Sequence, residues 1–384
     1  MNRDSVIDEL RGIAILLVIT IHTGQVLKIF WDQSNRPLHP LIQYIFELGN
    51  YGVPLFFMIS GYLMSNLYES SLIVRSHQKF SFVKFYKRRF VRIFPLWIMF
   101  ALIAVLEYKL LKIGPINFYQ ESQNFSWKTV FDKGVIEINL ATTLKVLLLA
   151  SAFLLWTNKK MDDTVVPGGW SIQTEVLFYC IFPFIRKLTF KFIAISLFVL
   201  QVGYLIIKPT FSSNSSNLYN PVATFFEFGF LNSITFFVLG LLICELKNGK
   251  IALKQSDILW FFLLYTTGAF FPMTRGSYSE ALLLVFGFIF VYFFNHNTKP
   301  YTQIFGRFGK YTYFMYFIHF QILFLLVHLF NALAFVNVQF SNATNLVFLI
   351  MISLCIPIVT FISYVLAKLS WRFFEEPLIK RFSD

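Results

Sequence analysis

The segment "RRFVRIFPLWIMF" (Arg88–Phe100) places three arginines directly against an apolar run. This boundary is typical of the cytoplasmic end of a transmembrane helix, because Lys and Arg collect on that side of a membrane. The rest of the chain has a matching composition, since 57% of its 384 residues are hydrophobic and only 14% are charged. A soluble globular domain carries more charge than this. The sequence therefore indicates a polytopic membrane protein.

Long apolar segments predict an all-α membrane helix bundle. A helix that crosses the bilayer needs about 20 mostly apolar residues. No connection between these segments is long enough for a separate soluble domain, so we expect residues 1–384 to form a single domain. The candidate segments are 8–27, 46–66, 90–112, 142–156, 170–187, 189–207, 226–246, 257–272, 281–294, 311–330 and 345–369.

The basic residues predict how these segments are oriented. The connection 67–89 is rich in Lys and Arg, which places it in the cytoplasm together with the N-terminus. If every candidate segment crossed the membrane, the basic loops at 186–191, 247–254 and 299–310 would all lie outside. They fall inside if the short segment 142–156 lies in the interface or re-enters without crossing. We therefore expect about ten transmembrane helices with both termini in the cytoplasm.

The remaining composition argues against several kinds of site. The formal net charge of +13 follows mainly from the asymmetry of the loops, so it requires no nucleic-acid partner. Cys180, Cys244 and Cys355 each lie in an apolar segment, and their spacing fits neither a metal site nor a disulfide framework. We expect no metal and no permanently bound cofactor.

The first apolar segment contains two ionisable residues, Arg11 and His22. At about 100° per residue they lie on one face of a helix, separated by a rise of roughly 16 Å. An ionisable group within a membrane span indicates a functional site by default. The alternative is an arginine that anchors the helix and a histidine that is hydrogen-bonded within the bundle.

A second ionisable position lies in "PGGWSIQTEVLFY" (Pro167–Tyr179), which predicts a helix that enters the membrane from outside. Ser171 and Glu175 share one face of that helix. A buried carboxylate needs a partner, and His22 is the natural candidate at a similar depth. A histidine oriented by a carboxylate is suited to act as a general base. The same residue types also form proton relays in transporters, so both interpretations stay open at this point.

Several motifs make the chain resemble the acyltransferase-3 family of integral membrane acyltransferases, which acylate surface glycans, lipopolysaccharides and related acceptors. The resemblance covers residues 11 to 377. We expect no C-terminal esterase-like extension of the kind that some members of the family carry. The matching motifs are, in order, the Arg11–His22 spacing, "LFFMISGYL" (Leu55–Leu63), "RRFVRIFP" (Arg88–Pro95), "WSIQTEVLFY" (Trp170–Tyr179), "GKYTYFMYFIHF" (Gly309–Phe320) and "FFEEP" (Phe373–Pro377).

The resemblance implies a site for acetyl-coenzyme A at the arginine cluster. Arg88, Arg89 and Arg92 stand at the cytoplasmic end of the third span. Guanidinium groups bind the oxyanions of phosphate groups in a bidentate manner, which lysine cannot do. Anchoring by the positive-inside rule remains the alternative for each arginine taken alone.

Further binding residues are implied by the other motifs. Ser60 and Gly61 lie in the second span, where small residues are also common at helix contacts. Trp170 and Ser171 open the motif that contains Glu175. We also expect His319 in the substrate site, although hydrogen bonding within its tyrosine-rich helix would explain it equally.

The expected function is transfer of an acetyl group from cytoplasmic acetyl-coenzyme A to a hydroxyl of an extracytoplasmic glycan or lipid-linked sugar. His22 would remove the proton of that hydroxyl, and Glu175 would orient the imidazole of His22, with Arg11 in the same site. A variant of this mechanism passes through an acetyl-histidine intermediate. Without the extension, transfer would be completed in the membrane domain or with a separate periplasmic helper protein. The resemblance implies a bacterial inner membrane. A proton-coupled transporter or glycan flippase is the competing interpretation, but the chain shows no inverted repeat.

Overall fold

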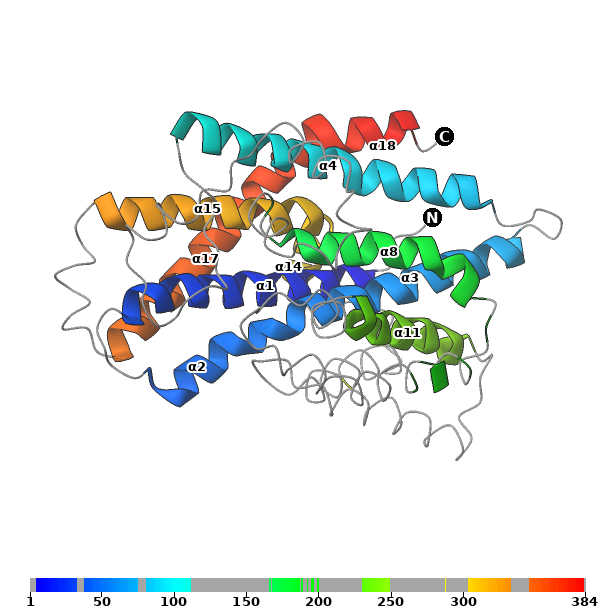
Figure 1. Ribbon diagram of the computed structural model, residues 1–384, viewed down its shortest axis with the longest axis horizontal. Helices are drawn as coiled ribbons and strands as arrows, with labels where there is room; N and C mark the ends of the chain where they lie inside the picture. Colours follow the sequence, from blue (N-terminus) through cyan, green and yellow to red (C-terminus); the bar gives the residue numbers. More distant parts are fainter. Residues whose placement is uncertain are drawn as a thin grey trace, which may run out of the picture.

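The computed structural model describes the following residues: 5–32, 38–74, 81–111, 166, 168–186, 188, 192, 195–196, 199, 230–248, 287, 303–332 and 345–382. Every element within these ranges is a helix (Figure 1). The predicted all-α class is therefore confirmed for the described part of the chain.

Seven of the predicted apolar segments are matched by long helices. Their bounds follow the predictions closely at most ends. The helices are α1 (Ser5–Asp32), α3 (Gly52–Val74), α4 (Phe82–Leu111), α8 (Gly169–Ile185), α11 (Phe230–Lys247), α15 (Thr312–Ala332) and α17 (Asn345–Ser370). The predicted segments 142–156 and 257–272, and most of 189–207 and 281–294, lie outside the described residues.

Short helices flank the long ones. The predicted segment 46–66 is divided, because α2 (Pro40–Glu47) and a 3-10 turn (Leu48–Tyr51) precede α3. Gly49 and Asn50 lie in that turn, and both residue types favour turns over regular helix. The other short elements are α14 (Gln303–Gly309), a π-helical turn (Trp371–Glu375) and α18 (Glu376–Phe382).

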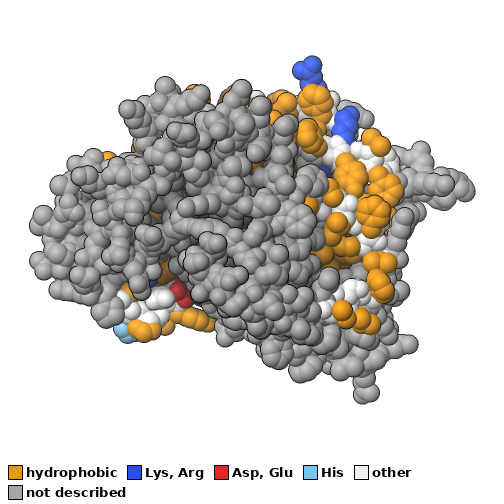
Figure 2. Space-filling model, viewed as in Figure 1, with side chains coloured by type: hydrophobic (Ala, Val, Ile, Leu, Met, Phe, Trp, Pro, Cys, Tyr) orange, Lys and Arg blue, Asp and Glu red, His pale blue; other side chains and the backbone are white. Residues whose placement is uncertain are grey.

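Two described helices are long and apolar enough to cross a membrane, Ser5–Lys28 and Asn345–Phe382. The first is mostly buried in the bundle, whereas most of the second is not. Large apolar side chains such as Leu354 and Phe361 are exposed on α17, as expected for a surface that contacts lipid. Figure 2 shows that the described surface on one face is mostly hydrophobic, with Lys and Arg at its upper edge. The count of ten transmembrane helices and the cytoplasmic location of both termini stay predictions.

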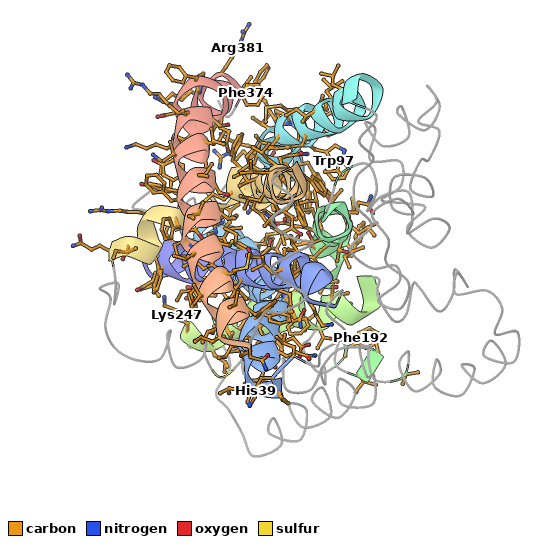
Figure 3. All side chains as sticks on the ribbon, turned by 90° about the vertical axis from the view of Figure 1, so that its left-hand side faces the viewer. His39, Trp97, Phe192, Lys247, Phe374 and Arg381 are labelled. Carbon is orange, nitrogen blue, oxygen red and sulfur yellow. The ribbon has the colours of Figure 1, made fainter. Side chains whose placement is uncertain are left out.

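Helix α1 is central to the described bundle. It packs against α3, α14, α15 and α17, while α3 packs closely against α11. Helix α17 runs obliquely across α1 and α15, as the two views show (Figures 1 and 3). At its N-terminal end, Asn345 Oδ1 accepts a hydrogen bond of 3.0 Å from the backbone N–H of His39. Trp97 lies in the interior, beside Phe317 of α15.

Glycines bring α3 and α11 into backbone contact. A Cβ atom at Gly61 would lie 2.1 Å from the carbonyl oxygen of Phe237, and one at Gly240 would lie 2.0 Å from that of Met58. Only glycine fits at such a crossing, since any side chain would force the helices apart. Gly61 thus lies at a close helix contact, and its part in binding stays a prediction.

A buried ionic group fixes α8 against the same pair of helices. Arg186, which follows α8, forms ion pairs with Glu69 of α3 and Glu245 of α11. Its guanidinium also lies 5.5 Å from the centre of the Tyr68 ring. Charged groups inside a membrane protein pair in this way because hydrocarbon does not solvate them. The end of α8 is therefore held in place, which positions the side chains that precede it.

Candidate active site

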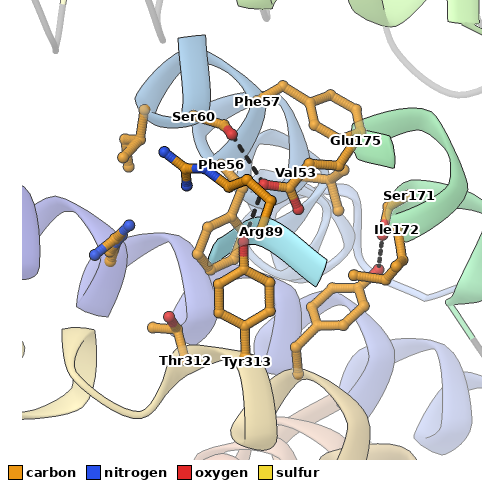
Figure 4. Close-up of a pocket in the computed structure, with 13 residues that line it drawn as sticks. Val53, Phe56, Phe57, Ser60, Arg89, Ser171, Ile172, Glu175, Thr312 and Tyr313 are labelled. Carbon is orange, nitrogen blue, oxygen red and sulfur yellow. Dashed lines mark hydrogen bonds between the residues drawn. The ribbon is translucent and has the colours of Figure 1, made fainter. Parts of the chain in front are cut away.

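A cavity lies among α1, α3, α4, α8 and α15 (Figure 4). Its apolar walls are formed by Val53, Phe56, Phe57, Ile59 and Ile172. Its polar and aromatic groups are Arg11, Ser60, Arg89, Ser171, Glu175, Thr312, Tyr313 and Tyr316. Apolar walls with a few convergent polar groups are typical of small-molecule sites.

Glu175 is the centre of a hydrogen-bonded group that we call the Glu175 cluster (Ser60, Glu175, Tyr179 and Tyr313). Its Oε1 accepts hydrogen bonds from Ser60 Oγ at 2.9 Å, from Tyr313 Oη at 2.9 Å and from Tyr179 Oη. The donors come from α3, α15 and α8 itself. A buried carboxylate with three hydroxyl donors is well compensated for its loss of water. The cluster therefore links three helices around one oxygen atom.

Two arginines of α4 lie over the tyrosine rings of this cluster. The guanidinium carbon of Arg89 is 5.3 Å from the centre of the Tyr179 ring, and that of Arg92 is 4.7 Å from the centre of the Tyr313 ring. Cations at these distances are attracted by the faces of aromatic rings. Within the described ranges neither guanidinium forms an ion pair, so its N–H groups are not committed to a carboxylate.

The other two predicted arginines differ in their surroundings. Arg11 lines the cavity and lies 3.5 Å from Asp8 in an ion pair one turn away. Arg88 is exposed, because it points from the other side of α4 than the cavity-lining Arg89. The structure therefore brings Arg11 and Arg89 to the cavity and Arg92 to its Tyr313 wall, and it leaves Arg88 at the surface.

The N-terminal end of α8 is fixed against α15. Ser171 Oγ and Tyr316 Oη lie 2.7 Å apart, and both donate to the carbonyl oxygen of Gly168, at 3.0 and 3.1 Å. Gly168 has a φ of 74°, in the left-handed region. A Cβ atom at this position would also lie 2.8 Å from the Phe320 ring and 2.9 Å from Tyr316 Oη. Only glycine suits both the conformation and the contact.

His22 and His319 form a second group, the histidine pair. Their ring centres are 5.5 Å apart, and both rings contact Phe320, at 4.6 and 4.1 Å. His22 Nδ1 lies 3.0 Å from Gln25 Oε1, and His319 Nδ1 lies 3.1 Å from the carbonyl oxygen of Met315. Both side chains are buried. His319 Nε2 has no hydrogen-bond partner among the described residues.

The two groups lie at different levels of the bundle. Helices α8 and α15 run in opposite directions, since Gly168 contacts Tyr316 and Phe320 whereas Glu175 bonds to Tyr313. Glu175 is seven residues beyond Gly168, which corresponds to about 10 Å along a helix. The histidine pair therefore lies near the start of α8, and the Glu175 cluster lies about two turns further along it.

Comparison with known proteins identifies the class of the chain. The profile of the acyltransferase-3 family, described as an acyltransferase domain, matches residues 4–364. The chain belongs to the acyltransferase-3 family. The predicted resemblance is therefore confirmed.

Two curated relatives are similar to parts of this chain. Nodulation protein 10 of Rhizobium leguminosarum bv. viciae is 26% identical over 160 residues, which are 41% of this chain and 39% of that protein. Acyltransferase MdmB of Streptomyces mycarofaciens is 27% identical over 186 residues, which are 47% of this chain and 39% of that protein. The chain thus matches well under half of the length of these relatives. No solved structure matches it.

The structure changes one expectation about the predicted site. We expected Glu175 to bond to His22, but the hydrogen bonds of the carboxylate come from the hydroxyls of Ser60, Tyr179 and Tyr313. His22 pairs its Nδ1 with Gln25 instead. The physical reason is the depth of the two residues, because α8 begins at the level of the histidine pair and carries Glu175 away from it.

The other predicted positions are accounted for within the described residues. Ser60, Ser171 and Glu175 line the cavity. Trp170 lies in the first turn of α8, and its side chain is outside the described residues. His319 lies beside His22. None of these placements tests the predicted role of the residue.

Sequence reasoning missed the tyrosines. Tyr179, Tyr313 and Tyr316 supply hydroxyls to Glu175 and Ser171, from positions within two motifs that were already singled out. Their spacing carried a signal, since Tyr313 and Tyr316 lie on one face of a helix, three residues apart, with His319 following after three more. In a chain with 18 Tyr and 50 Phe, that pattern is hidden among aromatic residues that only pack.

Proposed function

We propose that this acyltransferase moves an acetyl group from cytoplasmic acetyl-coenzyme A to a hydroxyl of an extracytoplasmic glycan or lipid-linked sugar. The observation that carries the proposal is the pair of arginines, Arg89 and Arg92, stacked on the tyrosines of the Glu175 cluster beside the cavity. Among the described residues these two guanidinium groups form no ion pair, and guanidinium groups in fixed positions are suited to bind a polyphosphate.

The donor is held by the arginine side of the site. Arg89 and Arg92 bind phosphate oxygens, and Arg11 adds positive charge from α1. The narrow pantetheine arm of the donor then lies in the cavity between Phe56, Phe57 and Ile172. This placement directs the thioester along α8 toward the histidine pair.

His22 acts as the general base. It takes the proton of the acceptor hydroxyl at Nε2, because Nδ1 is already bonded to Gln25. The hydroxyl oxygen bonds to the acetyl carbon, the carbon–sulfur bond breaks, and the thiolate of coenzyme A receives the proton from His22. The N-terminal end of α8 lies beside Tyr316 and Phe320, where its partial positive charge favours the developing oxyanion.

The Glu175 cluster has a positioning role in this scheme. Its hydrogen bonds fix the hydroxyls of Tyr179 and Tyr313, and the two rings in turn carry Arg89 and Arg92. A carboxylate at this place also balances the charge of the arginines before the donor binds. Glu175 thus prepares the donor site and does not orient the base.

The test is transfer of labelled acetyl from acetyl-coenzyme A to cell-surface glycan. Wild type is compared with His22→Ala and with His328→Ala at matched protein levels, because His328 is a second histidine of α15 with no proposed role. Loss of label in the first variant alone is expected. Label that persists in His22→Ala would remove His22 from the chemistry. A wild type that transfers no label and gains no thermal stability from coenzyme A would contradict the proposed function.

A further inference from the structure

One buried nitrogen in the histidine pair is left without a partner. His319 is fully buried, and its Nε2 has no hydrogen-bond partner among the described residues. Its Nδ1 faces the carbonyl oxygen of Met315 at 3.1 Å. A carbonyl oxygen only accepts, so Nδ1 carries the hydrogen and Nε2 of the neutral ring carries a lone pair. Buried polar atoms are nearly always paired, so this lone pair marks a place where a ligand donates.

His22 has the same tautomer. Its Nδ1 is bonded to Gln25 Oε1, which leaves Nε2 as the basic atom of that ring. The two ring centres are 5.5 Å apart, with the ring of Phe320 against both. The two histidine rings, each with a basic Nε2, thus lie beside one another and against the same aromatic ring.

Two histidine rings whose centres are 5.5 Å apart fit two hydroxyls of one ligand. A hydrogen bond between a hydroxyl and a ring nitrogen spans about 2.7–3.2 Å, so rings 5.5 Å apart can each bind one of two hydroxyls on neighbouring carbons. In the proposed reaction only one hydroxyl gives up its proton, and it gives it to His22. A hydroxyl on the next carbon can then donate to His319 and keep its own proton.

We propose that His319 is a specificity-determining residue that binds the hydroxyl next to the one acylated, so that the acceptor of this enzyme is a vicinal diol of a sugar. The inference rests on the proposed function. It adds no reacting atom to the transfer: the oxygen–carbon bond forms at the hydroxyl on His22, and the carbon–sulfur bond breaks as before. His319 holds the acceptor in one orientation and disfavours alcohols with a single hydroxyl.

A contact with the donor is the competing explanation for the unpaired nitrogen, because the arm of coenzyme A contains amide N–H groups. The positions of the arginines and of His319 along α8 favour a contact between His319 and the acceptor. The arginines that would bind the donor phosphates lie around the Glu175 cluster, whereas His319 lies beyond Tyr316, at the start of α8. The two explanations differ in a measurable way, since only a donor contact would alter binding of coenzyme A.

The experiment compares two small acceptors, trans-1,2-cyclohexanediol and cyclohexanol, with the purified full chain in proteoliposomes and labelled acetyl-coenzyme A. The variants are His319→Phe, which removes the acceptor atom, and His319→Gln, which keeps a side-chain oxygen that can accept. His328→Phe is the matched control, because His328 is a second histidine of α15 with no proposed role. Thermal stabilisation by coenzyme A is measured for every variant.

Wild type is expected to favour the diol by at least about tenfold in kcat/KM, because a site built to bind a hydroxyl rejects the analogue that lacks it. His319→Phe should remove this preference by lowering transfer to the diol, while transfer to cyclohexanol stays within about threefold of wild type. His319→Gln should keep part of the preference, and His328→Phe should keep all of it. Stabilisation by coenzyme A should not change.

Four outcomes would overturn the inference while leaving the proposed function intact. They are an unchanged diol preference in His319→Phe, an equal loss of transfer to both alcohols, a loss of stabilisation by coenzyme A, and a wild type that labels cell glycan without favouring the diol. A wild type that labels neither glycan nor small alcohol would instead contradict the proposed function.

Discussion

The Glu175 cluster and the histidine pair are built from similar buried polar side chains, yet they are satisfied to different degrees. The carboxylate of Glu175 receives hydrogen bonds from three hydroxyls, and two of those tyrosines also carry arginines. In the histidine pair, one nitrogen of His319 has no partner in the described part of the chain. A fully satisfied network is rigid, whereas an unsatisfied buried atom is stable only if a ligand completes it. The first group is thus suited to hold a ligand in place, and the second to contact reacting groups.

Among the substitutions that test the difference between the two groups, replacing Glu175 is expected to have the largest effect on acetyl transfer. Glu175→Ala removes the common acceptor of three hydroxyls, so the tyrosines that support Arg89 and Arg92 are no longer fixed. We expect acetyl transfer to fall by about 10²-fold or more, as for other losses of positioning. Stabilisation by coenzyme A should be lost with it, and a melting curve with and without coenzyme A measures this.

The same variant decides between the two roles considered for Glu175. If Glu175→Ala kept its stabilisation by coenzyme A while kcat fell, the carboxylate would act on the histidine pair and the separation into two groups would be wrong. Glu47→Ala is a suitable control, since that carboxylate bonds to Gln43 within α2, away from the cavity.

The arginines of α4 test whether stacking on tyrosine defines the donor site. Arg89→Ala and Arg92→Ala should each weaken coenzyme A binding by roughly ten- to fiftyfold, the range expected for hydrogen bonds to a charged group. Arg88→Ala is the control from the same turn, because Arg88 is exposed. Titration of coenzyme A by calorimetry measures all three. An equal effect of all three substitutions would indicate general attraction of the anion, without a defined site.

Gly168→Ala tests the region of the histidine pair, where α8 begins. Its left-handed φ and the contacts with Phe320 and Tyr316 leave no room for a methyl group. We expect a loss of about 1–3 kcal/mol in stability. We also expect transfer to fall by about tenfold, because the start of α8 moves relative to the histidine pair. Gly306→Ala is the control, as its added Cβ would meet nothing within 4 Å. Wild-type rates in Gly168→Ala would contradict the proposed role of this helix end.

The smallest effect is expected at the C-terminal helices. Glu375 is buried at the end of the π-helical turn and interacts electrostatically with Arg92. Its neighbour Glu376 forms an ion pair of 3.0 Å with Lys380 at the surface. Glu375→Gln removes a negative charge near the donor site, so coenzyme A should bind about two- to threefold more tightly at low salt. Glu376→Gln should leave the affinity unchanged. A weaker affinity in Glu375→Gln would mean that the carboxylate positions Arg92 and does not merely oppose the donor.

Much of the fold was predictable because it depends on local sequence. Apolar segments of about 20 residues predict helices whatever their neighbours are, since a backbone in hydrocarbon must satisfy its own hydrogen bonds. The helices α8, α15 and α17 begin and end close to the predicted bounds for this reason. The division of segment 46–66 was not predicted, because a short turn does not interrupt its apolar character.

The sequence by itself determined the helical class, the family and which ionisable residues stand inside the apolar segments, because composition, periodicity and motif spacing are properties of the linear chain. The tertiary structure decided how those residues are paired. Glu175 meets Ser60 and Tyr313 across 115 and 138 residues, and His22 meets His319 from another helix. Such pairs depend on where α8 begins relative to α1 and α15. A left-handed glycine and close helix contacts set that position, and no pattern within a single helix records it.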